Sequence, residues 1–153
     1  MVATALGSPG IDLNFGCPAK AVNKSRGGAI LLKDPNTLYN IAKAVRSAVP
    51  GHLPVTAKMR LGFDDASLAI ENAQALSEGG ATEIAIHART KSDGYKPPAY
   101  WEHIALIAKH VKTPLIANGE IWNPEQAKLC QSRSGCTNIM LGRGALALPN
   151  LAS

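Results

Sequence analysis

Cys17 is the residue whose type and setting most directly suggest chemistry. It lies between Gly16 and Pro18, just after a short β-prone run from Ile11 to Phe15. A glycine and a proline at the end of a strand favour a turn that presents a side chain. A lone cysteine inside a core behaves instead as a small hydrophobic residue. We therefore treat Cys17 as a candidate functional thiol, with an ordinary buried cysteine as the alternative.

Lys58 and His87 are the next candidates. Lys58 interrupts an otherwise apolar run from Val55 to Met59, and burying an ammonium group there without an anionic partner would be costly. Because Arg60 points to the same side, a solvated strand end is the alternative. His87 ends another apolar run, and it is either a functional imidazole or a satisfied core histidine.

The segment from Gly142 to Ala147 matches the pattern GxGxxA of dinucleotide-binding turns. A dinucleotide fold would place this turn after its first strand, with an acidic residue about 20 positions later, whereas here it comes at the end of the chain. The turn could still bind a phosphate group, because glycine lets backbone N–H groups approach a phosphate and Arg143 adds positive charge. A phosphate site in the loops after the last two strands is a recurrent feature of barrels of eight βα units.

Five β-prone runs alternate with helical segments. Each run is apolar on both faces or nearly so, as expected for parallel strands covered by helices. Repeated strand-to-helix units favour right-handed crossovers and therefore an α/β fold. The expected strands are Ile11 to Phe15, Pro54 to Met59, Glu83 to Ala88, Pro114 to Ala117 and Asn138 to Leu141.

Start and stop signals define four helices between these runs. Asp34-Pro35 is a cap followed by proline at the first helical position, and an apolar stripe follows it. A second helix is expected from about Ala66 to Glu78, where two glycines follow, and a third from about Tyr100 to Val111. A fourth begins at Asn123-Pro124, whose Gln126 completes a capping-box pattern.

Polar residues follow all five expected strands. Because ligands bind at the carboxyl ends of parallel strands, these residues are expected to converge on one cavity. They are Asn14, Gly16 and Cys17; Lys58 and Arg60; His87 and Arg89; Asn118, Gly119 and Glu120; and Gly142, Arg143 and Gly144.

Size and composition indicate one globular domain. The chain has 153 residues, of which 46% are hydrophobic and 18% charged, and a formal net charge of +5 that would suit a polyanionic partner. It lacks a membrane-length apolar run and a secretory signal, so we expect a cytoplasmic protein. The cysteines have no metal-binding spacing, so no metal site is expected and Cys130 and Cys136 are interpreted as structural.

These patterns together resemble the tRNA-dihydrouridine synthase family, and most closely its bacterial C-type branch. The resemblance covers essentially the whole chain and keeps the family's order. It is carried by Asn14-x-Gly16-Cys17-Pro18-x-x-x-Val22, Gly27-Gly28-Ala29-x-Leu31, Val55-x-x-Lys58-x-Arg60-x-Gly62, His87-x-Arg89-Thr90, Asn118-Gly119-x-Ile121 and Gly142-Arg143-Gly144-Ala145.

The resemblance implies a TIM (β/α)8 barrel that binds FMN, is reduced by NADPH and acts on tRNA. A complete barrel needs about 250 residues. The five βα units are therefore expected to be strands four to eight, making residues 1–153 a partial FMN-binding barrel. The first barrel strands and the family's C-terminal helical domain, which grips tRNA, are expected to be absent.

The resemblance also implies roles for individual residues. Cys17 is the implied general acid, which protonates C5 of the uracil while hydride goes to C6. Asn14, Arg60 and Arg89 are implied to contact the substrate, and Lys20, Lys24 and Arg26 are expected to meet tRNA phosphates unless they are only solvated surface. The implied cofactor contacts are Lys58, His87, Asn118, Gly119, Glu120, Gly142, Arg143 and Gly144.

Two alternatives stay open at this point. The chain could belong to another FMN-dependent ene-reductase with the same barrel, or it could be a folded but inactive module. Five strands of an open barrel would leave two unpaired edges and an apolar interior, so self-association is also expected. Which uridine is modified is not encoded in these motifs.

Overall fold

The computed structural model describes residues 2–152 and contains one five-stranded parallel sheet. The strand order is β1-β2-β3-β4-β5, which is also the order along the chain. This α/β arrangement of parallel strands and alternating helices is that of part of a TIM barrel, as predicted. The strands are β1 (Ile11–Phe15), β2 (Val55–Arg60), β3 (Glu83–His87), β4 (Leu115–Asn118) and β5 (Ile139–Met140).

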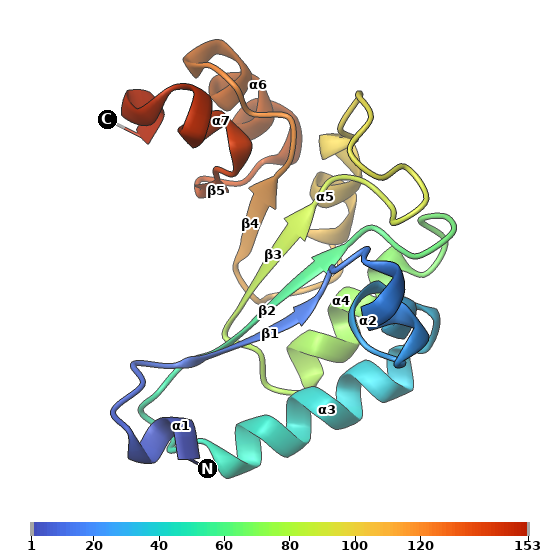
Figure 1. Ribbon diagram of the computed structural model, residues 1–153, viewed down its shortest axis with the longest axis vertical. Coiled ribbons are helices and arrows are strands. Elements are labelled where there is room, and N and C mark those ends of the chain that lie inside the picture. Colours follow the sequence, from blue (N-terminus) through green and yellow to red (C-terminus); the bar gives the residue numbers. More distant parts are fainter. Residues whose placement is uncertain (1, 153) are drawn as a thin grey trace.

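The larger helices follow one another around one side of the curved sheet, and the opposite face of the sheet carries no helix in this view (Figure 1). They are α3 (Pro35–Ala48), α4 (Ala69–Glu78), α5 (Trp101–Ile107) and α6 (Pro124–Ser134). Short elements complete the chain: α1 (Val2–Ala5), α2 (Lys20–Lys24), the 3-10 helix η1 (Gly28–Lys33), α7 (Arg143–Ala147) and the 3-10 helix η2 (Pro149–Ala152).

The predicted helix caps are confirmed. The Asp34 side chain accepts hydrogen bonds from the Asn36 N–H at 3.1 Å and from the Thr37 hydroxyl at 2.6 Å, and these bonds lower the pKa of Asp34. The Asn123 side chain accepts from the Gln126 N–H at 2.8 Å. The Gln126 side chain, however, accepts from the N–H of Trp122, one residue before the cap. That bond ties the loop after β4 to the start of α6.

Two helices are shorter than predicted. The helix expected from Ala66 begins at Ala69, because Asp65 accepts from the Ser67 N–H at 2.9 Å and holds the preceding residues in a loop. The helix expected to reach Val111 ends at Ile107, beyond which the Lys109 and His110 N–H groups bond to carbonyls three residues earlier.

The hydrophobic core lies between the sheet and its helices, with fully buried side chains such as Leu38, Met59, Leu76, Ile84 and Ile104. A continuous core on this side explains why the elements hold together without a second covering layer.

The uncovered face of β1 and β2 is polar, so the expectation of strands apolar on both faces and of an apolar interior is wrong here. Asp12 and Asn14 are exposed and Thr56 and Lys58 partly exposed, in alternation with buried or half-buried apolar residues. The Thr56 hydroxyl donates to Asp12 at 2.7 Å across the two strands. An inner barrel face that leads to a ligand site needs such polar groups, which explains the difference.

Both edge strands are paired on one side only within residues 2–152, β1 with β2 and β5 with β4. Self-association through these edges stays a prediction. In the same part of the chain, no helix has the length and apolar character needed to cross a membrane. No cluster of His, Cys, Asp or Glu side chains there is arranged to hold a metal ion.

Candidate functional site

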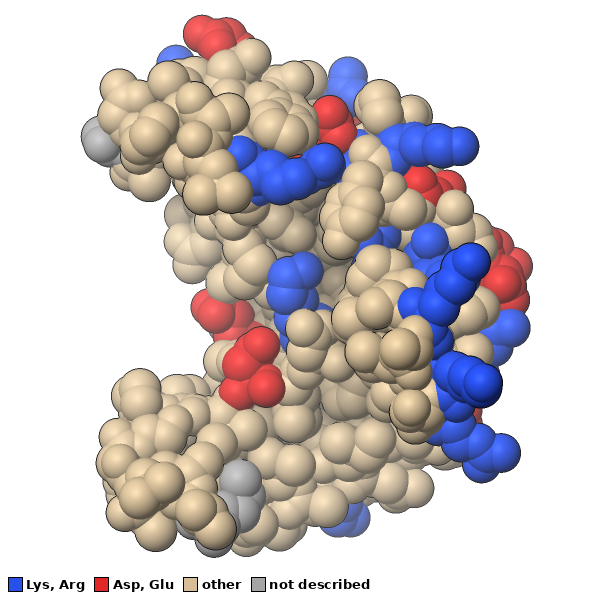
Figure 2. Space-filling model, in the orientation of Figure 1, with Lys and Arg blue, Asp and Glu red and all other residues tan. Residues whose placement is uncertain are grey.

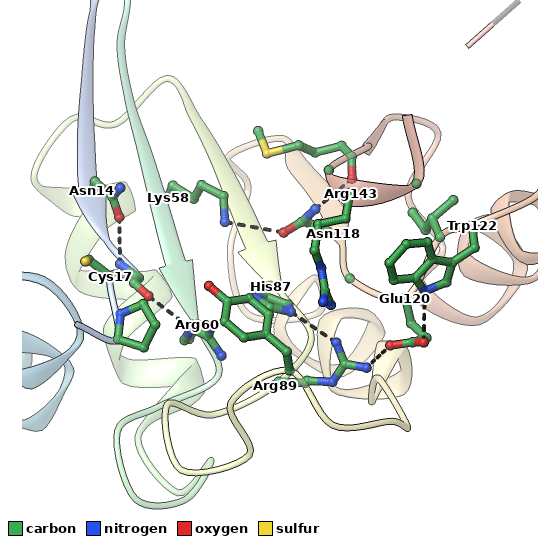
Figure 3. A pocket seen from close by; sticks show the side chains of 18 residues that line it. Asn14, Cys17, Lys58, Arg60, His87, Arg89, Asn118, Glu120, Trp122 and Arg143 are labelled. Atoms are coloured by element: carbon green, nitrogen blue, oxygen red, sulfur yellow. Dashed lines mark hydrogen bonds and ion pairs between the residues drawn. The ribbon is translucent and has the colours of Figure 1, made fainter. Parts of the chain in front are cut away.

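A cavity of about 410 Å³ opens at the carboxyl ends of all five strands. Its volume is in the range of small-molecule sites. Every residue for which the resemblance implied a catalytic, cofactor or base-contacting role lines this cavity (Figure 3). These residues are Asn14, Cys17, Lys58, Arg60, His87, Arg89, Asn118, Gly119, Glu120, Gly142, Arg143 and Gly144.

The Cys17 turn is held by the segment that follows it. The Gly16 N–H donates to the Asn14 side chain at 2.9 Å, and the Cys17 carbonyl accepts from the Ala29 N–H at 3.0 Å and from the Asn23 amide at 2.9 Å. Gly28 has a φ of +64°, and a Cβ there would lie 2.7 Å from the Cys17 carbonyl. The half-buried thiol is therefore presented from a fixed backbone. Asn23 helps to hold this backbone, although no sequence pattern had identified it.

Arg60 connects the loops after β1 and β3. Its buried guanidinium donates through Nε to the Gly16 carbonyl at 3.0 Å and through Nη1 to the carbonyls of Thr90 and Gly94, both at 2.8 Å. The Tyr95 ring centroid lies 5.1 Å from its Cζ. Much of its donor capacity is thus used to hold the two loops around the cavity.

Lys58 directs a half-buried ammonium group into the cavity. Its Nζ lies 3.3 Å from Asn118 Oδ1, and the Asn118 amide is oriented by its own donation to the Met140 carbonyl at 2.7 Å. Within residues 2–152 no carboxylate forms a salt bridge with it. Burial, and then the neighbouring Arg60, lower the pKa of Lys58. The charge of Asp12 acts to raise the pKa of Lys58, but Asp12 forms no ion pair with it, so this part of the chain leaves the ammonium without a directly bound anion.

Arg143 lines the cavity together with two aromatic rings. The Arg143 Cζ lies 4.9 Å from the Tyr95 ring centroid and 5.0 Å from that of Trp122. Neither aromatic residue was predicted as part of the site, because each follows a strand by several residues and only folding brings it over the cavity. The backbone at Gly142 is open, whereas a Cβ on Gly144 would lie 2.0 Å from the Ile121 carbonyl. Gly144 is thus needed for packing, and Gly142 leaves room for a ligand.

His87 is a buried imidazole, 7% exposed, at the end of β3. Burial, and then the charges of Arg60, Lys58, Arg89 and Arg143, lower its pKa to about 3. The ring is therefore neutral at physiological pH.

The pKa of His87 predicts how stability changes with pH. Between its ordinary value of 6.5 and about 3, the unfolded chain binds more protons at this residue than the folded chain does. Stability should therefore fall as the pH falls through this window, with this group contributing up to about 1.4 kcal/mol per pH unit. The free energy of unfolding, measured by urea unfolding at pH values from 7 to about 5, where carboxylates are still mostly ionised, should change less with pH for His87→Gln than for the unsubstituted chain. An equal dependence on pH in the two chains would contradict the lowered pKa of His87.

Lys20, Lys24 and Arg26 lie outside the cavity. They are exposed on α2 and the turn after it, where Arg26 has a φ of +56°. Figure 2 shows Lys and Arg side chains along the margin of the molecule over α2 and the neighbouring loops. Their exposure is compatible with both a phosphate-binding role and a merely solvated surface.

Comparison with known proteins gives one consistent family. The family model described as dihydrouridine synthase matches residues 1–153. The chain is 61% identical over 152 residues to a tRNA-dihydrouridine(16) synthase of Shewanella oneidensis, covering 99% of this chain and 48% of the relative. Relatives of the same name in Pseudomonas syringae and Yersinia pestis are 58% and 54% identical, covering 98% of this chain and 47% and 48% of their own lengths. The chain thus spans about half the length of the curated relatives it matches.

Proposed function

The chain belongs to the dihydrouridine synthase family, and we propose that, within a complete barrel, it reduces the C5=C6 bond of a uridine in tRNA to dihydrouridine. The observation that carries this proposal is the convergence of Cys17, Lys58 and the Gly142 turn on one cavity. We take the five βα units as strands four to eight of that barrel. The names of the relatives further favour uridine 16 as the target and disfavour an ene-reductase that acts on a free small molecule.

The residues of the cavity fit FMN. The Lys58 ammonium forms no ion pair with a carboxylate within residues 2–152, as expected if it meets the electron-rich edge of a flavin ring. Asn118 lies beside it, and Gly142 and Arg143 offer an open backbone and a guanidinium to the phosphate side. FMN, once reduced by NADPH, would supply the hydride that C6 receives.

The protein side chains supply the proton and the placement of the base. Cys17 is the thiol of the cavity, and its S–H group is suited to donate a proton to C5 as negative charge develops there. Asn14 belongs to the same turn and lies beside the thiol, where its side chain would orient the uracil. Since the reactive edge of a uridine is hidden in stacked RNA, the base must be flipped out to reach the cavity.

A chimeric enzyme tests this proposal, because the chain alone covers half of its relatives. Residues 1–153 would replace the corresponding segment of the Shewanella oneidensis relative, and the product would be incubated with NADPH and tRNA that lacks dihydrouridine. We expect dihydrouridine to form at position 16. A folded, flavin-loaded chimera that oxidises NADPH but leaves the tRNA unchanged would contradict the proposed substrate.

The exposed basic residues on α2 give a separate prediction. Replacing Lys20 and Lys24 by alanine in the chimera should weaken tRNA binding and reduce the slope of log K against log salt by about two, at about 0.9 per phosphate contact. Arg26 is kept because of its left-handed backbone. The matched control replaces Lys109 and Lys112, which are exposed near the opposite end of the sheet. Equal slopes for both pairs would show that Lys20 and Lys24 are merely solvated.

A further inference from the structure

Arg89 contacts the ring of His87 through an atom that can only donate. Arg89 is 1% exposed, and its Nη1 lies 3.4 Å from His87 Nε2. A guanidinium has five N–H donors and no acceptor. A proton on Nε2 would therefore face another donor, so the contact requires that Nε2 carries no proton and accepts.

The remaining proton of the ring must then be on Nδ1. Four cationic side chains surround the ring, which is held neutral, so it carries one proton in total. Within residues 2–152, Nδ1 makes no hydrogen bond, while the ring itself lines the cavity. The Nδ1–H group is thus the polar atom of His87 that is left to meet a ligand.

Arg89 is itself anchored on two further sides. Its Nε donates to the Pro98 carbonyl at 3.1 Å, and its Nη2 forms an ion pair with Glu120. Glu120 has a φ of +57°, and its other carboxylate oxygen accepts from the Trp122 indole at 3.0 Å. A non-glycine residue in this conformation persists only where its surroundings determine it.

The backbone before Glu120 also restrains the ring. A Cβ on Gly119 would lie 2.8 Å from His87 Cδ2 and 3.2 Å from Nε2. The Gly119 backbone therefore closes against the same ring edge that Arg89 contacts, so both the ring and the guanidinium have fixed positions.

We propose that Arg89 is a positioning residue that fixes His87 in the neutral Nδ1–H tautomer, so that the imidazole offers a hydrogen-bond donor to a carbonyl or ring-nitrogen acceptor in the cavity. The identity of that acceptor rests on the proposed function, in which a flavin occupies this space. The tautomer of His87 does not depend on the proposed function. Arg89 then acts through His87 and not on the substrate, and His87 holds its proton while Cys17 gives one up.

Nitrogen NMR of the histidine rings tests this inference on the 153-residue chain. The chain would be labelled with 15N-histidine, and the His87→Gln spectrum would identify the signals of His87 among the four histidines. In the unsubstituted chain at about pH 7, where an ordinary histidine is largely neutral, we expect a protonated Nδ1 and an unprotonated Nε2. Protonation of Nε2, alone or together with Nδ1, would overturn the proposal.

Substitutions of Arg89 test whether this residue fixes the tautomer of His87. Arg89→Met removes the donor and should move a substantial fraction of His87 to the Nε2–H form, whereas Arg89→Lys, which retains a donor, should keep the Nδ1–H form. The matched control Arg133→Met removes an exposed arginine that pairs with Glu102 at 3.3 Å and should change nothing. An unchanged tautomer in folded Arg89→Met would overturn the inference. If Arg89→Met does not fold, the tautomer in the unsubstituted chain and in Arg89→Lys tests the inference. An Nε2–H form in either of them would overturn it.

FMN binding to the chimera separates this inference from the proposed function. FMN titrated into the folded chimera should bind about tenfold more weakly when Arg89 is replaced by methionine, since one positioned hydrogen bond is lost. FMN that binds equally to the two chimeras would overturn the ligand-directed part of the proposal. An Nδ1–H tautomer in a chimera that binds no FMN would contradict the proposed cofactor and leave the role of Arg89 in fixing the tautomer intact.

Discussion

Replacing Cys17 by alanine in the chimera is expected to lower the rate of uridine reduction by roughly 10²- to 10⁴-fold, the usual contribution of a positioned general acid. The proton for C5 would then have no donor at the end of β1. Flavin binding and flavin reduction by NADPH should change little, because the thiol lies in the turn after β1 and the proposed flavin contacts come from β2 to β5. Stopped-flow measurement of the two half-reactions separates these effects.

A second thiol provides the matched control. Cys136 is buried away from the cavity, and burial raises its pKa, so Cys136→Ala should retain the rate of uridine reduction. Cys17→Ser should fail like the alanine variant, because an alcohol is a much weaker acid than a thiol. A Cys17→Ala chimera that reduces tRNA at the unsubstituted rate would remove the thiol from the mechanism.

Replacing Lys58 by methionine is expected to separate ligand binding from stability. The ammonium is half-buried with a neutral amide as its nearest partner, and burial lowers its pKa. Its removal should leave the free energy of unfolding unchanged or raise it by about 1 kcal/mol, as when other partly desolvated charges give way to apolar groups. FMN affinity in the chimera should fall at least about tenfold, because the cation that faces the electron-rich edge of the flavin ring is lost.

An exposed lysine serves as the control for that change. Lys109→Met should leave FMN affinity unchanged, since Lys109 lies on the segment after α5 and outside the cavity. Isothermal titration gives the affinity, and urea unfolding of the same preparations gives the stability. A large loss of stability in Lys58→Met without any loss of FMN affinity would make Lys58 a structural residue.

The sequence predicted the fold where local signals were strong. The Asp34-Pro35 and Asn123-Pro124 starts are found as predicted, because a capping side chain and a proline act within a few residues. The helix α2 and the 3-10 helix η1 were missed, since they depend on side-chain-to-backbone hydrogen bonds within the loop after β1 that no periodic pattern marks. Asn23, for example, donates to the Cys17 carbonyl and accepts from the Ile30 N–H at 2.7 Å.

The location of the site was predictable, while the detailed use of its side chains was not. Parallel strands bring their carboxyl ends together, which is why Cys17, Lys58 and His87 could be placed in one cavity from sequence alone. That Arg60 holds carbonyls of two loops, and that Arg89 is buried against Glu120, follows only from side-chain packing. Sequence patterns therefore identify which residues gather at the site more readily than which atoms face a ligand.

The central claim is that one cavity places the flavin against Lys58 and the Gly142 turn, with Cys17 facing the base. A crystal structure of the chimera with FMN tests it most directly. It should show the flavin ring within hydrogen-bonding distance of the Lys58 ammonium, its phosphate beside Gly142 and Arg143, and the Cys17 thiol across an open space of uracil size. A flavin bound elsewhere, or one that covers Cys17 and leaves no room for a base, would contradict the account.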